Sequence, residues 1–405
     1  MALIVQKYGG SSVADHERVM NVAKRITETY EKGNQVVVVV SAQGDTTDHL
    51  IDMAYDINPK PSKREMDMLL STGEQISIAL LAMAIEKLGY PAISLTGVQV
   101  GIKTSCMYSN ARIESIRDDR VRKELDDNKI VIVAGFQGID EKGNITTLGR
   151  GGSDTTAVAL AAALEADVCE IYTDVDGVYT ADPRVVPEAR KLREVTYGEM
   201  LELASLGAKV LHNRSVELAS KYNVKMVVRS SLNYNEGTLI MEVNEMEKMV
   251  VKGVAHDTDV ARISIIAVRD IPGVAYKIFK LLADENINVD IILQSIGRDD
   301  TKDISFTVTK AQLTEAVDLI NKNLDYIGAK SVSFTNDVAK VSVVGAGMAN
   351  NPGIAALMFE ALAEEGININ MISTSEIKIS CLIDREDAEN AVRAIHKKFR
   401  LDEVV

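Results

Sequence analysis

Cysteine is scarce in this chain. The 405 residues include three cysteines, Cys106, Cys169 and Cys381, which are widely spaced and form no paired framework. This usage excludes the disulfide-stabilised secreted classes and fits a reducing cytoplasm. The five histidines, among them His49 and His212, have no metal-ligand spacing with these cysteines, so the sequence predicts no metal site built from protein ligands alone.

Long apolar runs are also missing. The longest, such as Ile78–Ile85 and Ala157–Leu164, span about eight residues, whereas a membrane helix needs roughly 20. The opening residues, MALIVQKYGG, enter a strand-like run without a charged region or a cleavage site. We therefore expect no signal peptide, no membrane partner and a cytoplasmic location. The length allows two to three domains.

Positive charge is in deficit. Lysine and arginine number 45 against 59 aspartates and glutamates, which gives a net charge of −14. Nucleic-acid binding by counterion release needs the opposite sign, so we expect no nucleic-acid partner. An anionic substrate would be repelled by the chain as a whole. Any phosphate site must therefore gather its own cations, with a divalent metal ion helping.

Several familiar signatures are absent. The chain has no G-x-x-x-x-G-K-[ST] loop, and Gly149–Asp154 does not complete G-x-G-x-x-G. The catalytic and metal-binding triplets of protein kinases are missing too, and no nucleophilic serine or cysteine paired with a histidine can be inferred. These absences exclude the commonest nucleotide-binding and hydrolase classes.

What the first 240 residues do contain is an alternation of strand-like and helix-like segments. This pattern predicts an α/β domain with a largely parallel sheet that is covered on both faces. The expected strands are Leu3–Lys7, Gln35–Ser41, Pro91–Leu95, Lys129–Phe136 and Val168–Tyr172. The expected helices are His16–Lys32, Glu74–Leu88, Ile113–Asp127 and Thr155–Ala166. Ligands of such sheets bind beyond the carboxyl ends of the strands, where Gly, Ser, Thr and Asp gather in Lys7–Ser12, Ser41–Asp48, Gly135–Gly138, Gly149–Thr156 and Thr173–Tyr179.

The segment Leu148–Leu164 (LGRGGSDTTAVALAAAL) is the most informative of these. Its glycines let backbone approach a ligand closely, and the first turn of the helix that follows attracts phosphate or carboxylate. Arg150 adds a cation to the loop. The alternative is a loop that binds nothing and only caps the helix. It accounts for the same sequence, since Ser, Thr and Asp are favoured at helix starts.

Three other motifs admit a functional and a structural interpretation. Lys7–Ser12 suits a phosphate cradle, or it is a solvated lysine before a capped helix. Ser71 and Glu74 have capping-box spacing, or Glu74 accepts hydrogen bonds from a substrate ammonium. Tyr172–Tyr179 is an Asp-Gly turn, or it holds a nucleotide together with Asp174, Tyr179, Asp182 and Arg184; it is not a calcium loop.

After about residue 245 the chain contains an internal repeat. Each copy reads strand, Pro-Gly turn, apolar helix, strand, strand, helix, with Pro272-Gly273 in the first copy and Pro352-Gly353 in the second. This order predicts two ferredoxin-like domains, which usually associate side by side. A duplicated structural domain without a ligand is the alternative. We expect domains at residues 1–245, 262–335 and 338–405.

Together these pieces closely resemble the aspartokinase family of the amino acid kinase superfamily, in its monofunctional form with tandem ACT domains. The matching motifs come in that family's order and cover essentially the whole chain; they include Lys7–Ser12, Ser41–Asp48, Ser71–Gln75, Gly135–Gly138, Gly149–Ala157, Tyr172–Tyr179 and Leu206–His212. The resemblance implies an amino acid kinase-like α/β sandwich followed by two βαββαβ ACT domains. Asp48 is a departure, because some relatives carry Asn there.

The resemblance also implies an activity and the residues that perform it. ATP and L-aspartate would give 4-phospho-L-aspartate and ADP, the first step toward lysine, threonine and methionine. Catalysis would rest on Lys7 and Asp154, with Asp154 orienting Lys7. Aspartate would be bound by Ser41, Thr47, Glu74, Arg150 and Ser153. ATP, with Mg²⁺ on its phosphates, would be bound by Lys7, Tyr8, Gly9, Gly10, Thr173, Asp174, Tyr179, Arg184, Lys209 and Val210.

For the repeats, the resemblance implies feedback inhibition by lysine, threonine or both. Effector contacts would come from Asp270, Ile271, Pro272, Gly273, Val274, Ala275, Asn288, Val289, Asp290 and Gln294 in the first copy. The second copy would contribute Ile354, Ala355, Asn368, Ile369, Ser375 and Glu376. We expect a homo-oligomer, a dimer or dimer of dimers, formed through the ACT domains. A shorter regulatory subunit starting at Met246 or Met249 is a further expectation.

Two rival functions remain open from sequence. One is a different amino acid kinase, acting on glutamate, carbamate or a nucleoside monophosphate; Glu74 and Arg150 favour an α-amino acid instead. The other is a non-catalytic amino acid sensor, which the intact set of Lys7, Arg150, Asp154 and Asp174 disfavours.

Overall fold

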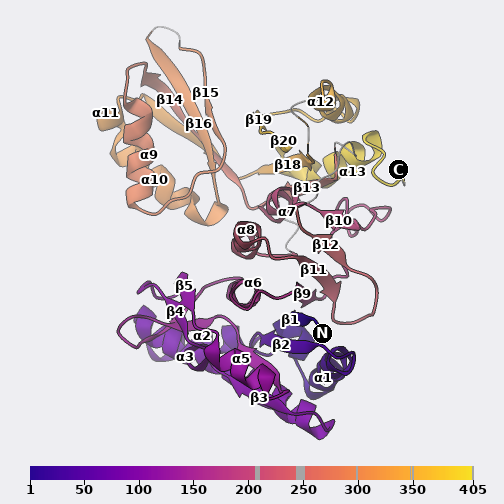
Figure 1. Cartoon of the computed structure of the whole chain (residues 1–405). Coiled ribbons are helices and arrows are strands. Elements are labelled where there is room, and N and C mark those ends of the chain that lie inside the picture. The colour runs from indigo at the N-terminus through magenta and orange to yellow at the C-terminus, as the bar shows by residue number, and fades with distance from the viewer. Residues whose placement is uncertain (206–209, 243–250, 298–299, 347, 349–350, 404–405) are drawn as a thin grey trace. The chain divides into compact units, whose positions relative to one another are not determined.

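The computed structural model describes residues 1–205, 210–242, 251–297, 300–346, 348 and 351–403. The chain divides into two compact units (Figure 1). The first comprises Met1–Val178, Lys191–Ser205 and Lys209–Met246, and the second Tyr179–Arg190, Leu206–Ala208 and Glu247–Val405.

An eight-stranded sheet forms the centre of the first unit, in the order β10-β12-β11-β9-β1-β2-β6-β3. Neighbouring strands run parallel except for β11 and β12, which are antiparallel. The largely parallel α/β sheet predicted from the sequence is therefore confirmed. Its strands are β1 (Leu3–Tyr8), β2 (Gln35–Val40), β3 (Ala92–Leu95), β6 (Ile130–Ala134), β9 (Val168–Thr173), β10 (Glu194–Val195), β11 (Met226–Ser230) and β12 (Thr238–Ile240).

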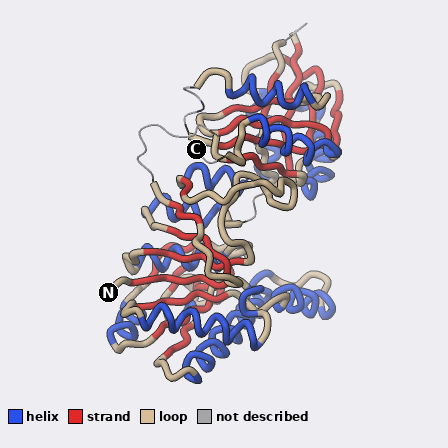
Figure 2. The backbone as a smooth tube through the Cα atoms, turned by 90° about the vertical axis from the view of Figure 1, so that its right-hand side faces the viewer, coloured by secondary structure: helices blue, strands red, loops and turns tan. Residues whose placement is uncertain are grey.

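Helices cover both faces of this sheet, as its all-apolar strands require. Alternate residues of β2, such as Val36 and Val38, pack in one cluster with residues of α1 (His16–Glu31) and α3 (Lys63–Lys87). Val37 and Val39 are also fully buried and point to the opposite face. There α6 (Gly152–Ala163) contacts β1, β2 and β9. Figure 2 shows these helices flanking the strands.

A small sheet of order β5-β4-β7-β8 completes the first unit beside the large one. Its strands are β4 (Ile102–Thr104), β5 (Ile113–Ile116), β7 (Gln137–Ile139) and β8 (Ile145–Thr147). The remaining helices of this unit are α2 (Thr46–Ile57), α4 (Gly97–Val100), α5 (Asp119–Asp126), α7 (Tyr197–Leu203) and α8 (Asn213–Tyr222).

Three local expectations were wrong. The long helix begins at Lys63 rather than Glu74, because Ser62 caps it by accepting a hydrogen bond from the Glu65 N–H. Ser71 therefore lies inside the helix, and its capping-box interpretation fails. The expected helix Ile113–Asp127 is strand β5 followed by the shorter α5, because Ile113–Ile116 pairs with β4. Helix α2 occupies part of what was expected to be a loop, Ser41–Asp48.

Helix α3 is long and apolar enough, by length and composition alone, to cross a membrane. A core helix passes the same test, and α3 has that position: it contacts α1, α2, β3, β6 and β8. It also buries charged side chains, Asp67 and Glu74. The helix is therefore the central packing element of the first unit.

The first ACT-type repeat forms a four-stranded antiparallel sheet of order β15-β16-β14-β17. Its core is shared between the sheet and its two longer helices, with Phe306 fully buried. The elements are β14 (Ala261–Arg269), α9 (Val274–Asp284), β15 (Ile292–Gln294), β16 (Thr301–Val308), α10 (Leu313–Lys322), α11 (Leu324–Ile327) and β17 (Ser331–Thr335).

The second repeat completes its sheet with a strand from elsewhere in the chain. Its order is β13-β18-β20-β19, and β13 (Gly253–Asp257) precedes the first repeat in sequence. Strand β18 is buried along its whole length and pairs on both edges, with β13 taking the place that β17 has in the first repeat. The sheet thus reaches outside the span 338–405 expected for this domain. The other elements are β18 (Val338–Val344), α12 (Ile354–Glu364), β19 (Met371–Thr374), β20 (Lys378–Asp384) and α13 (Ala388–Lys398).

Candidate active site

The loops singled out from the sequence follow neighbouring parallel strands of the large sheet. In register, Lys7 of β1 lies beside Val39 of β2 and Ile171 of β9. The loops after β1, β2, β6 and β9 therefore leave the sheet at one edge, where open α/β sheets bind ligands. The first turn of α6 also lies there, and its N–H groups have no partners within the helix, although those of Gly152 and Thr155 donate to the Gly149 and Gly151 carbonyls.

Lys7 and Asp154 form an ion pair at this edge. Lys7 Nζ lies 2.7 Å from Asp154 Oδ1, and each side chain is 12% exposed. Asp154 is in the first turn of α6, where the helix dipole favours a carboxylate. A Cβ on Gly9 would lie 3.4 Å from Lys7 Nζ, so glycine there leaves room around the ammonium. The pair holds a cation in place beside the helix amino end.

The loops after β1 and β2 touch through backbone. The Gly44 N–H donates to the Gly10 carbonyl at 3.1 Å. A Cβ on Gly10 would lie 2.6 Å from the Ala42 carbonyl oxygen, which excludes any side chain. The glycines therefore set the close approach of these two loops.

The turn before α6 is equally tight. A Cβ on Gly135, after β6, would lie 2.6 Å from Ser153 Oγ. Gly151 has φ of +68°, and a Cβ there would lie 2.2 Å from the His212 ring. The Phe136 N–H donates to Thr156 Oγ1 at 3.1 Å. Arg150 lies in this turn, exposed, and forms no ion pair within the described residues.

Glu74 is the most perturbed acid of the site. It lies within α3, is 3% exposed, and its Oε1 accepts a hydrogen bond from the Ala42 N–H at 3.2 Å. Its Oε2 is buried with no hydrogen-bond partner. Burial raises the pKa of Glu74 to about 7, against the opposing effect of hydrogen bonds from backbone N–H groups. A buried carboxylate with a free oxygen is suited to accept an ammonium group.

The other residues expected to bind aspartate lie on the same loops. Ser41 directly follows β2, and its N–H donates to the Tyr8 carbonyl at 3.1 Å. Thr47 is in the first turn of α2 beside Asp48, and Ser153 is buried in the first turn of α6.

Serine hydroxyls join the loops after β1, β9 and β11. Ser12 Oγ donates to Ser231 Oγ at 2.7 Å, and the Ser231 N–H donates to the Thr173 carbonyl at 2.9 Å. Thr173 Oγ1 in turn donates to Asp174 Oδ1 at 2.9 Å. Sequence reasoning missed Ser231, because nothing local marks the end of β11 as part of this edge.

Tyr8 is fully buried. Its ring stacks on Tyr172, with centroids 4.6 Å apart, and its carbonyl accepts a hydrogen bond from the Ser41 N–H, so no atom of Tyr8 is exposed to a ligand. Tyr179 and Arg184 belong to the second unit. Val210 is half-buried, while Lys209 and most of the motif Leu206–His212 lie outside the described residues.

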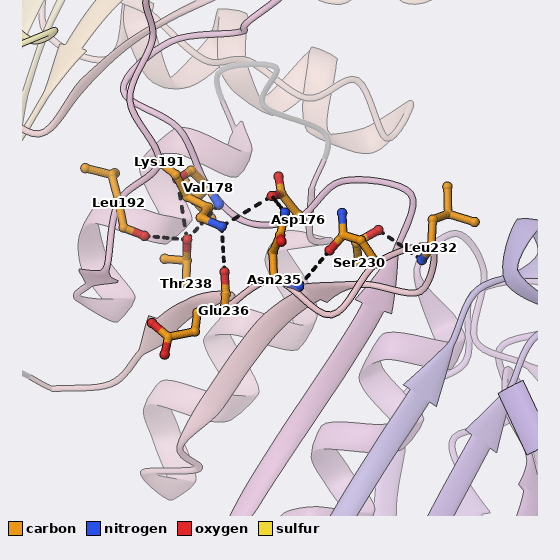
Figure 3. Close-up of polar contacts among 10 residues, drawn as sticks. Asp176, Val178, Lys191, Leu192, Ser230, Leu232, Asn235, Glu236 and Thr238 are labelled. Carbon is orange, nitrogen blue, oxygen red and sulfur yellow. Dashed lines mark hydrogen bonds and ion pairs between the residues drawn. The ribbon is translucent and has the colours of Figure 1, made fainter. Parts of the chain in front are cut away.

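The Asp-Gly turn after β9 is held by a polar cluster (Figure 3). Lys191 Nζ lies 3.2 Å from Asp176 Oδ2 and donates to the Glu236 carbonyl at 2.6 Å. Asn235 Nδ2 donates to the same Asp176 oxygen at 3.1 Å. Thr238 Oγ1 accepts from the Val178 N–H at 2.8 Å and donates to the Leu192 carbonyl at 2.7 Å. Asp176 is thus held by contacts within the chain, while Asp174 is exposed.

In the ACT-type repeats, both aspartates expected to hold an effector are paired with lysines. Asp270 Oδ1 lies 2.8 Å from Lys302 Nζ, and Asp290 bonds to Lys340. Val274 is in the core of the first repeat, so only its backbone can face a ligand. The other expected contacts lie at the Pro-Gly turns, the helix starts and the strand ends.

Comparisons with known proteins agree with this architecture. The model of the amino acid kinase family matches residues 2–230, and that of the ACT domain matches residues 263–324 and 341–399. Aspartokinase of Bacillus sp. strain MGA3 is 52% identical over 402 residues, 99% of this chain and 98% of that protein. Aspartokinase of Corynebacterium glutamicum is 53% identical over 407 residues, 99% and 97% of the two chains. The chain belongs to the aspartokinase family.

A solved member of the aspartokinase family shows the same fold. Escherichia coli aspartokinase III, in complex with aspartate and ADP, has a TM-score of 0.81 with 25% identity, over 98% of this chain and 99% of that chain. The protein is thus an aspartokinase-family enzyme with an amino acid kinase domain and ACT domains, and it uses ATP. The predicted family, fold class and enzyme class are confirmed.

Proposed function

We propose that the first unit transfers the γ-phosphate of ATP to the side-chain carboxylate of L-aspartate, giving 4-phospho-L-aspartate and ADP. The observation that carries the substrate assignment is Glu74: a buried carboxylate with one unpaired oxygen, at the sheet edge that also holds Lys7. Its raised pKa falls back once an ammonium group pairs with it. Arg150, exposed and unpaired, would hold the α-carboxylate.

Catalysis of this reaction requires that the two substrates be aligned and that the negative charge on the phosphoryl oxygens be neutralised. The nucleophile is a carboxylate with an ordinary pKa near 3.9, so it is ionised at neutral pH and needs no general base. Lys7, oriented by Asp154, and the N–H groups of Gly9, Gly10 and the first turn of α6 would stabilise charge on the phosphoryl oxygens. Ser41, Thr47 and Ser153 would orient aspartate in the first unit.

On the nucleotide side, Thr173, Asp174, Tyr179, Arg184, Lys209 and Val210 would contact ATP. Mg²⁺ usually binds through substrate phosphates, waters and one or two carboxylates. The donor set of this edge, with Asp154 and Asp174, fits that mode. The ion would supply neutralising charge on the phosphates.

Lysine, threonine or both would inhibit the enzyme by binding the ACT-type repeats. Turn and strand-end amides would hold the effector's carboxylate, and Asp270, Asp290 or Glu376 its ammonium. E. coli aspartokinase III has been solved with lysine and aspartate in a T state.

We further propose a cytoplasmic homo-oligomer formed through the repeats. The internal starts Met246 and Met249 lie outside the described residues, so a shorter subunit stays a prediction.

The test is product formation by the full chain. Purified protein with ATP, Mg²⁺, L-aspartate and hydroxylamine should yield aspartyl hydroxamate, and Lys7→Ala should lower kcat by about 10²–10³. Parallel reactions with glutamate, carbamate and nucleoside monophosphates separate the rival kinases. Hydroxamate from glutamate but not aspartate, or near-normal turnover by Lys7→Ala, would contradict the assignment.

A further inference from the structure

One segment of the kinase domain folds with the ACT-type unit. Residues 179–190 fall within the match to the amino acid kinase family, yet they pack in the second unit. Ala181, Val185 and Val186 join the buried cluster of the second repeat, together with strands β18 and β20 and helix α13. Arg393 of α13 also donates to the Val185 carbonyl at 3.3 Å. The core of the repeat is therefore completed by kinase-domain sequence.

A buried polar contact lies at the base of this segment. Thr180 Oγ1 lies 2.9 Å from His396 Nε2 of α13, and the two residues are 0% and 2% exposed. Burial lowers the pKa of His396 below its usual range, partly opposed by the nearby carboxylates of Asp402 and Glu188. Burial thus favours the neutral ring, whose Nε2 can donate or accept one hydrogen bond with the threonine hydroxyl.

The same hydroxyl closes the segment into a loop. The Arg190 N–H donates to Thr180 Oγ1 at 2.9 Å, and the Thr180 N–H donates to the Arg190 carbonyl at 2.9 Å. Two residues outside this pair on either side, the Leu192 N–H donates to the Val178 carbonyl at 2.8 Å, and Thr238 bonds to both Val178 and Leu192 (Figure 3). Tyr179 is thus the single residue between two backbone positions that are each fixed by a buried threonine.

We propose that His396 is a positioning residue for the nucleotide-binding segment. It holds Thr180, and through Thr180 it sets the backbone of Tyr179 and the closed loop that carries Arg184. His396 does not touch ATP; it couples the packing of the second repeat to the affinity of the kinase for nucleotide. This inference rests on the proposed function, in which Tyr179 and Arg184 contact ATP.

Two pairs of variants test the contact from both ends. His396→Ala and Thr180→Val remove one partner each, whereas His396→Gln and Thr180→Ser keep a polar group near the same place. The loss of one buried hydrogen bond corresponds to about a three- to tenfold change in affinity. We expect KM for ATP and Kd for ADP to rise by about that factor in the first pair, with KM for aspartate changed less than twofold. The second pair should be within about twofold of wild type.

A control separates positioning from general loss of stability. Ile383→Val removes one methylene from a β20 residue of the same buried cluster and leaves the Thr180–His396 contact intact. It should lower the melting temperature and leave the nucleotide constants unchanged. The double variant Thr180→Val/His396→Ala should be no weaker in ADP binding than Thr180→Val alone, because Thr180→Val already removes the Thr180–His396 hydrogen bond together with the bond from the Arg190 N–H.

The outcomes are distinguishable. Unchanged ADP affinity in folded Thr180→Val and His396→Ala, or an equal loss in Ile383→Val, would overturn the inference. If His396→Ala does not fold, Thr180→Val against Thr180→Ser decides it. Wild-type protein that binds ADP by calorimetry but forms no aspartyl hydroxamate would remove the proposed function alone, because the ADP comparison still tests His396.

Discussion

At the scale of single residues, Glu74 combines a cost in stability with a role in binding. Its carboxyl is buried, one oxygen has no partner, and its pKa is raised to about 7. The protein thus keeps an unfavourable charge at a place where a substrate ammonium would neutralise it. Such perturbed acids are frequent at functional sites.

The pH dependence of catalysis should reflect the ionisation of the Glu74 carboxyl. Aspartate binding needs ionised Glu74, and with a pKa of about 7 the ionised fraction rises about tenfold between pH 6 and pH 8. We expect kcat/KM for aspartate to rise by about that factor, while aspartate's own charges stay constant. Glu74→Gln should lower kcat/KM and flatten the profile. A wild-type profile without this rise would remove Glu74 from ammonium binding.

Glu74 should have the opposite effect on stability: as the pH rises, its ionisation should lower the free energy of unfolding. The folded state holds the proton up to about pH 7, the unfolded state only to about pH 4.5. The folded state therefore binds more protons in this window, and the free energy of unfolding falls as the pH rises through it. Glu74→Gln should be more stable than wild type at pH 8, by on the order of 2–3 kcal/mol, and equal to it at pH 4. Urea unfolding at the two pH values measures this.

A complementary prediction concerns Arg150, the residue proposed to bind the α-carboxylate of aspartate. Its side chain is exposed and unpaired, so Arg150→Ala should leave the melting temperature unchanged. We expect KM for aspartate to rise at least tenfold and KM for ATP less than twofold, because a carboxylate clamp binds one substrate only. Arg120→Ala, on the exposed surface of α5, is the control. Equal effects on both substrates would contradict the clamp.

At the scale of elements, the edge of the sheet was predictable and its packing was not. Lys7, the glycine loops and the start of α6 follow from local patterns: apolar strands that end in Gly, Ser, Thr and Asp. The contact of Gly135 with Ser153 and the link through Ser231 join residues far apart in sequence, and no local signal marks them. The start of α3 was misplaced because its buried polar positions, including Asp67, weaken the apolar period.

Gly135 shows how such packing controls chemistry. A methyl group there would lie 2.6 Å from Ser153 Oγ and 3.0 Å from its Cα, so the first turn of α6 would have to move. Gly135→Ala should cost about 1–3 kcal/mol in stability. It should also lower kcat by at least tenfold, because Asp154 and its partner Lys7 move with that turn. Kinetics and urea unfolding of the purified variant measure both.

Gly33 provides the matched control. It has φ of +81° with open space around it, so Gly33→Ala costs about 1–2 kcal/mol from backbone strain alone. It should leave kcat unchanged. A Gly135→Ala enzyme with normal kcat would show that the α6 turn tolerates displacement.

At the scale of the whole molecule, the two repeats are not equivalent copies. The first is a continuous segment, whereas the second takes β13 from before the first and buried side chains from residues 179–190. The internal repeat in the sequence predicts two domains. It does not predict the pairing of β13 with β18, because these strands are separated in the sequence by the whole first repeat. The second repeat is therefore completed by two segments from outside its own span, of which residues 179–190 lie within the match to the amino acid kinase family.

A pair of fragments tests the role of β13. Residues 249–405 include it and residues 262–405 do not, while both lack residues 179–190, so their difference is β13 with its flanking residues, among them Ala261 of β14. Strand β13 pairs with β18 at five positions and buries Val254 and Ala255. Its loss should cost more than about 2 kcal/mol and leave an apolar strand edge prone to association. We expect a lower urea midpoint and concentration-dependent aggregation for residues 262–405, measured by circular dichroism and light scattering. Equal midpoints would mean that β18 needs no partner on that edge, and that the second repeat is as self-contained as the first.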